Sequence, residues 1–127
     1  GRHAWAELPV YDRDSCTSSY HLFQLRIRGI NEEQRDRIIQ RIFDRDVSVN
    51  VHYIPVPRMS FYRGLGYDLG NYPVAQDNFS REISLPVFYD ITDEQVRTVV
   101  EAVVASVEEE LGRQEVGQQV GQEVGQG

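Results

Sequence analysis

The amino-acid sequence predicts an α+β two-layer sandwich, in which helices cover one face of a small, mainly antiparallel sheet. Residues 20–28 alternate between apolar and polar side chains, which is typical of a half-buried strand. Residues 31–45 and 92–111 instead repeat apolar residues at three- and four-residue spacing, which is typical of amphipathic helices. The full order is strand, helix, strand, two short helices, strand and long helix, and this order indicates the two layers.

The first strand and the first helix have the clearest patterns. Alternate residues in 21–27 share the apolar face of the strand. The helix begins at Asn31, whose side chain can cap it together with Gln34 in a capping box. We expect this helix to end at about Asp44 or Arg45.

A second strand is predicted over residues 47–54, where valines alternate with polar residues. It ends at Pro55, because proline cannot donate a ladder hydrogen bond. The excursion that follows contains two short helical turns in residues 58–65 and a further short helix over residues 73–79, separated by glycines. A brief strand over residues 82–85 completes the sheet.

The end of the chain combines a long helix with a repetitive tail. The helix begins at Thr92, which opens a capping box, and is expected to end at Gly112. Residues 112–127 repeat glycine every few positions, so we expect them to be disordered. Residues 1–19 show no sustained period and form an irregular lead-in, which leaves residues 20–111 as the folded domain.

Composition limits the class of protein. The 127 residues, 40% of them apolar, suffice for one domain with a core. A net charge of −7 disfavours nucleic acid and anionic membranes as partners, because both attract basic surfaces. The sequence shows no bilayer-spanning run and no secretory signal, and it predicts a cytoplasmic protein. Because the chain begins with Gly1 rather than methionine, we expect a piece of a longer protein.

Three residue types restrict the chemistry. All 13 basic residues are arginine, so no lysine of this chain can form a Schiff base or act as a base. Cys16 stands alone, which excludes an intrachain disulfide. The three histidines are too scattered for a metal motif, and we expect no metal site.

The segment around His52 is the most informative. Strand alternation places Asn50 and His52 opposite the valines, on a polar face. This face either meets solvent or meets a ligand or another domain, with His52 at its rim. The roles of two residues in the following excursion are also open. Arg58 can bind an anion or simply be solvated, and Tyr62 can bind a ligand or pack under the loop.

Taken together, short motifs in one order resemble the C-terminal domain of the DegT/DnrJ/StrS sugar aminotransferases over about residues 20–111. The matching motifs are Tyr20–Phe23, Val49–Pro55, Tyr62 with Leu65–Tyr67, Tyr72–Ala75, Ile83–Phe88 and Thr92–Val96. Ordinary alternation can produce any one of these motifs, but not the whole series.

The resemblance implies the small domain of an aspartate-aminotransferase-like, fold type I enzyme. Such enzymes use pyridoxal 5′-phosphate to move an amino group, typically from glutamate, onto a nucleotide-linked keto sugar for cell-surface or antibiotic sugars. The cofactor and its Schiff-base lysine belong to a large N-terminal domain that is missing from this chain, and the active sites lie at a homodimer interface. The chain alone is therefore expected to be inactive and to contain no catalytic or cofactor-binding residue.

The resemblance also implies that the small domain closes the cleft and contacts the substrate. The substrate-binding candidates in this chain are His52, Tyr53, Asn50, Arg58 and Tyr62. The family often has histidine where this chain has Pro57, and glutamate where it has Gln76, so the sugar stays unassigned. An alternative from another class is a stand-alone α+β module for ligand binding or oligomerisation, without catalysis.

If His52 faces a missing domain, the 127-residue chain should tolerate His52→Ala with little loss of stability in urea unfolding. A loss above about 2 kcal/mol would show instead that His52 is a satisfied core group.

Overall fold

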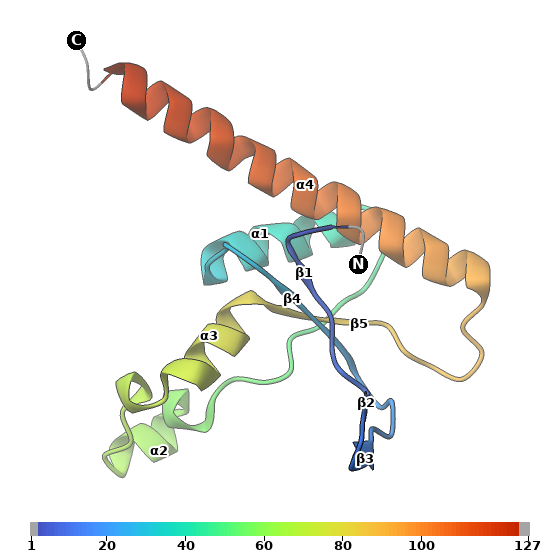
Figure 1. The fold of residues 1–127 in the computed structure, drawn as a ribbon. Helices are drawn as coiled ribbons and strands as arrows, with labels where there is room; N and C mark the ends of the chain where they lie inside the picture. The colour runs from blue at the N-terminus through green and yellow to red at the C-terminus, as the bar shows by residue number, and fades with distance from the viewer. Residues whose placement is uncertain (1–2, 125–127) are drawn as a thin grey trace.

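A three-stranded antiparallel sheet lies at the centre of the computed structural model, which describes the backbone of residues 3–124 and the side chains of residues 3–113. The strands β1 (Ala6–Glu7), β4 (Phe23–Ile27) and β5 (Glu82–Leu85) lie in the order β1-β4-β5 (Figure 1). Leu25 pairs with Ile83 across the two longer strands. The predicted strands at residues 20–28 and 82–85 therefore exist, and the antiparallel α+β expectation is confirmed.

Two helices cover one face of this sheet. They are α1 (Glu32–Phe43) and α4 (Asp93–Val124), which cross the sheet together in Figure 1. The core lies between the layers, because β4 and β5 point alternate apolar residues at the helices. Its fully buried members from the strands and helices are Ile27, Ile38, Ile42, Ile83 and Val107.

Both predicted capping boxes are present. The Asn31 side chain accepts a hydrogen bond from the Gln34 amide at 3.0 Å, and the Gln34 side chain accepts one from the Asn31 amide at 2.7 Å. Thr92 and Gln95 form the same pair of bonds ahead of α4. Local sequence thus defines where each long helix begins.

The excursion after Pro55 contains short helices near the predicted ranges 58–65 and 73–79, and also a turn over residues 69–71 that was not predicted. They are the single 3₁₀ turns η1 (Val56–Arg58) and η2 (Leu69–Asn71), with α2 (Ser60–Gly64) and α3 (Pro73–Arg81). Figure 1 shows them as an arm that extends from the sheet. The chain returns from α3 directly into β5.

The predicted second strand is wrong. Residues 47–54 form an extended segment in which only Asn50 pairs with the sheet, as a single bridge to Ser84. Beyond that bridge, side chains rather than a neighbouring strand provide the hydrogen-bond partners of the backbone. The amide of His52 donates to the Glu82 carboxylate, and the carbonyl of His52 accepts from Gln24. Alternating residues predicted an extended backbone here, but not which partners it would find.

Both ends of the chain differ from expectation. Within the lead-in 1–19, β1 extends the central sheet and the strands β2 (Asp12–Arg13) and β3 (Cys16–Thr17) form a separate hairpin. The helix α4 continues past Gly112 to Val124, which replaces the expected disorder over residues 112–124. Each residue added to a nucleated helix gains a backbone hydrogen bond, although each glycine costs about 1 kcal/mol relative to alanine. Residues 125–127 of the expected disordered tail lie outside the described part of the chain.

None of the helices within residues 3–124 has the length and apolar character that a membrane span requires.

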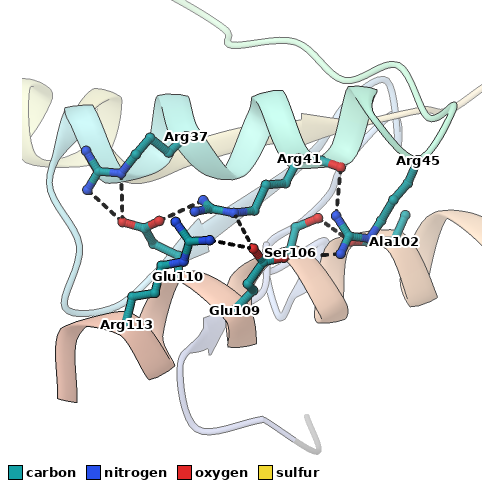
Figure 2. A network of polar contacts seen from close by, with 8 residues as sticks. All are labelled: Arg37, Arg41, Arg45, Ala102, Ser106, Glu109, Glu110 and Arg113. Atoms are coloured by element: carbon teal, nitrogen blue, oxygen red, sulfur yellow. Dashed lines mark hydrogen bonds and ion pairs between the residues drawn. The ribbon is translucent and has the colours of Figure 1, made fainter. Parts of the chain in front are cut away.

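An arginine and glutamate network joins α1 to α4 (Figure 2). Glu110 is 3% exposed and accepts hydrogen bonds from Arg37 at 2.6 Å and Arg41 at 2.7 Å. Its neighbour Glu109 pairs with Arg41 and Arg45 at the surface. The hydrogen bond from Arg37, helped by Arg41, holds the pKa of Glu110 below its ordinary value.

Glu110→Ala should destabilise the chain by about 2–3 kcal/mol, because it leaves the guanidinium of Arg41 without its buried partner. Glu109→Ala is the matched control, one residue away and more exposed, and should cost clearly less than Glu110→Ala. Because the pKa of Glu110 is lowered by folding, its contribution should be present at neutral pH and disappear as the pH falls below about 4.3, the ordinary range of a glutamate. Urea unfolding at pH 7 and pH 3 measures both effects. Equal losses for the two variants at pH 7 would contradict this role.

Candidate functional site

The face of the sheet opposite the core is polar. Gln24 and Arg26 on β4, and Glu82 and Ser84 on β5, point away from α1 and α4, as alternation along a strand requires. A pocket of about 400 Å³ opens on this face. Its lining residues are Pro9, Gln24, Arg26, His52, Tyr53, Pro55, Ala75, Asn78, Phe79 and Glu82. The sheet, the extended segment and α3 therefore build one site.

Glu82 forms a buried acidic wall of this pocket. Its side chain is among the buried polar groups, at 3% exposure for the residue. One carboxylate oxygen accepts the His52 amide at 3.0 Å, and the other accepts the Ser84 hydroxyl. Burial raises the pKa of Glu82, and the bonds from Ser84 and His52 oppose that shift. A carboxyl in this position holds a proton at higher pH than an exposed one.

The positive charge in the pocket is already paired. Arg26 lies opposite Glu82 in the strand register, but its guanidinium instead binds Glu7 at 2.6 Å and Asn78 at 2.7 Å. Glu7 also accepts from Arg81, and that bond, together with Arg26, lowers the pKa of Glu7. The positive charge of Arg26 is therefore already neutralised by Glu7 where Arg26 lines the pocket. The pocket presents amide, carboxyl and imidazole groups beside the apolar surfaces of proline and phenylalanine.

His52 and Tyr53 are the two sequence-predicted residues that the structure brings to the pocket. His52 is half-buried, and its Nδ1 is buried without a hydrogen-bond partner among the described residues. Tyr53 is 70% exposed at the rim. Tyr53 is therefore accessible to a ligand that reaches across the pocket, whereas Nδ1 of His52 is shielded from solvent.

The other three candidates lie elsewhere. Asn50 bridges to Ser84 through its backbone, and its side chain accepts the amide of Val51. The Arg58 guanidinium binds both carboxylate oxygens of Glu32 at 2.8 Å.

Tyr62 packs edge-on against Phe61 and Tyr67, with ring centroids 5.3 and 6.0 Å away. Each of these three residues thus makes a local contact that stabilises the bridge, the η1 turn or the arm. Their binding roles stay predictions.

Among the polar and charged residues of the pocket, sequence reasoning missed Gln24, Arg26, Asn78 and Glu82. The signal for the strand residues was available, because Gln24 and Arg26 fall on the polar side of the alternating first strand. Glu82 and Asn78 gave no such signal, since their position depends on how α3 delivers the chain into β5.

The residues of this chain do not fit pyridoxal phosphate as a binding site of their own. The chain has no lysine to hold the cofactor, and the arginine in the pocket is already bonded to Glu7 and Asn78. We therefore assign no step of a reaction through the cofactor to this chain.

Comparison with known proteins gives the class. The model of the DegT/DnrJ/EryC1/StrS aminotransferase family matches residues 3–104. The chain is 36% identical over 96 residues to the uncharacterised protein MJ1066 of Methanocaldococcus jannaschii, covering 72% of this chain and 24% of that protein. It is 29% identical over 109 residues to the spore coat polysaccharide biosynthesis protein SpsC of Bacillus subtilis, covering 81% and 23%.

A solved structure gives the same result. The candidate sugar aminotransferase Spr1654 of Streptococcus pneumoniae, in its apo form, matches with a TM-score of 0.82 and 33% identity, over 87% of this chain and 28% of that protein. Structures of its forms with PLP and with PMP also match. The fold is thus that of a small α+β domain from the C-terminal region of such proteins. The chain belongs to the DegT/DnrJ/EryC1/StrS aminotransferase family, and it spans about a quarter of the length of the curated relatives it matches.

Glu82→Gln should change how stability depends on pH. The pKa of Glu82 is raised by folding, so its carboxyl contributes most below the unfolded range near about 4.3 and loses that contribution as the pH rises through the higher folded pKa. The stability of the unmodified chain relative to Glu82→Gln should therefore fall over this rise in pH. Urea unfolding across pH 4 to 8 measures it, with Glu109→Gln as the exposed control. A relative stability that increases with pH would contradict the assignment.

Proposed function

We propose that this chain is the small C-terminal domain of a pyridoxal-phosphate-dependent aminotransferase that moves an amino group, from glutamate, onto a nucleotide-linked keto sugar. The domain closes the cleft of the whole enzyme and recognises the sugar. The observation that carries this proposal is the pocket on the polar face of the sheet, with His52 and Tyr53 at its opening. Family membership supplies the reaction class.

The chemistry of the pocket suits a sugar. A sugar ring presents hydroxyl groups at its edges and apolar C–H groups on its faces. Gln24 and Asn78 supply amide groups, Glu82 supplies a carboxyl, and Phe79 and Pro55 supply apolar atoms to the pocket lining. Ligand sites commonly combine apolar walls with a few polar groups that set orientation. His52 and Tyr53 then contact the substrate from the rim as the cleft closes.

A second surface supports docking against the rest of the enzyme. Large apolar side chains are exposed along residues 53–74, and exposed apolar surface of this kind commonly marks a protein contact. They are Tyr53, Ile54, Val56, Phe61, Leu65, Tyr67, Tyr72 and Val74. We assign this surface to contact with the missing N-terminal domain, within the homodimer of the full-length protein. This exposed apolar surface and the pocket share Tyr53, so docking and substrate contact occur on the same side.

This division of roles leaves the proton transfers to the other domain. No residue of this chain acts as the Schiff-base lysine, because the chain has none. What the domain adds is exclusion of water and orientation of the sugar, both of which strengthen electrostatic interactions at the reacting carbon.

The full-length gene product, loaded with pyridoxal phosphate, should form 2-oxoglutarate from glutamate when given a nucleotide-linked 4-keto-6-deoxy sugar. Tyr53→Ala in that protein should lower kcat/KM for the sugar about tenfold, through loss of about 1.4 kcal/mol of aromatic contact. Tyr89→Ala is the control, because Tyr89 is fully exposed and lies outside the pocket. The 127-residue chain should form no product. A full-length protein without a suitably placed lysine, together with calorimetric binding of a UDP-sugar by the 127-residue chain alone, would favour the stand-alone binding module instead.

A further inference from the structure

The segment that carries His52 and Tyr53 receives little support from the sheet. Asn50 pairs with Ser84 through two backbone hydrogen bonds, at 3.1 and 2.8 Å. After that bridge, residues 51–54 make no backbone ladder bond within the described part of the chain. An extended segment without a ladder partner is free to move unless side chains hold it.

Two side chains of the polar face hold this segment at one point. The Glu82 carboxylate accepts the amide of His52 at 3.0 Å, and the Gln24 side chain donates to the carbonyl of His52 at 3.1 Å. Both backbone groups of His52 are thus bound, one from β5 and one from β4. We propose that Glu82 and Gln24 are positioning residues that clamp the main chain of His52 and so hold the His52 ring and Tyr53 at the pocket.

The surroundings of Glu82 favour this role over a stabilising one. The nearby cations bind other groups: Arg26 binds Glu7 and Asn78, while Arg35 binds Asp36 and reaches Glu82 only through its backbone carbonyl, at 3.5 Å. A buried carboxyl without a paired cation generally lowers stability relative to an apolar residue. Its two hydrogen bonds, to Ser84 and His52, are what it contributes at this position.

Gln24 adds an independent contact. It is partly buried, and its bond to the His52 carbonyl does not involve the Glu82 carboxylate. Removal of Gln24 therefore loosens the same segment from the other side while the His52 amide keeps its acceptor. The clamp can be tested at either residue, so a variant that fails to fold at one leaves the other informative.

Backbone ¹⁵N relaxation of the 127-residue chain tests the clamp directly. Gln24→Ala and Glu82→Ala should each lower the order parameters of His52 and Tyr53 from about 0.85 to below about 0.6, while β4 and β5 stay rigid. Glu82→Gln should restore them, because its side-chain oxygen can still accept the His52 amide. Asn78→Ala is the matched control, since Asn78 lines the same pocket but binds Arg26. Unchanged order parameters in Gln24→Ala, or equal loosening throughout the sheet, would overturn the clamp.

The effect of the clamp on substrate binding rests on the proposed function, and it is measured separately through enzyme kinetics. In the full-length enzyme, Gln24→Ala should raise KM for the keto sugar about tenfold, the loss of one hydrogen bond, and change kcat much less. Tyr89→Ala should change neither. If relaxation shows a loosened segment but KM for the sugar does not change, the clamp stands and the proposed sugar site fails.

Discussion

Pairing of β4 with β5 is the constraint on which the other features of this domain depend. The two strands are more than fifty residues apart in the chain, yet Leu25 lies opposite Ile83 and Arg26 opposite Glu82. This register sends one set of side chains into the core against α1 and α4, and the next set onto the polar face. A slip of β5 by one residue would turn Ile83 onto the polar face and Glu82 towards the core. The core and the pocket thus lie on opposite faces of the sheet that this pairing forms.

The two buried glutamates, Glu110 between the helices and Glu82 on the polar face of the sheet, have different partners. Between α1 and α4, each buried carboxylate oxygen of Glu110 meets a guanidinium, so the ionised form is stabilised by folding. On the polar face, Glu82 is equally buried, and its donors among the described residues are the Ser84 hydroxyl and the His52 amide. Burial therefore dominates its pKa. The first arrangement joins two helices, and the second holds the extended segment around His52 beside the pocket.

The domain has two regions. The sheet, together with α1 and α4, forms the core and carries the pocket floor. The arm of residues 55–81 and the segment around His52 carry exposed aromatic groups. Arg58 and Tyr62, which the sequence suggested as ligand contacts, stabilise the arm through Glu32 and through neighbouring aromatic rings. Their residue types suggested a binding surface. They did not indicate that both side chains would instead make contacts within this chain.

The sequence by itself determined the features that depend on neighbouring residues. The capping boxes at Asn31 and Thr92, the strands around Leu25 and Ile83, and the absence of a Schiff-base lysine all follow from residue type and spacing. Tertiary structure decided the remainder, because it depends on partners distant in the chain. The segment 47–54 became a bridged loop rather than a strand because Gln24 and Glu82 bind the groups that a ladder would use. The pocket exists because α3 returns the chain to β5 with Asn78, Phe79 and Glu82 beside His52.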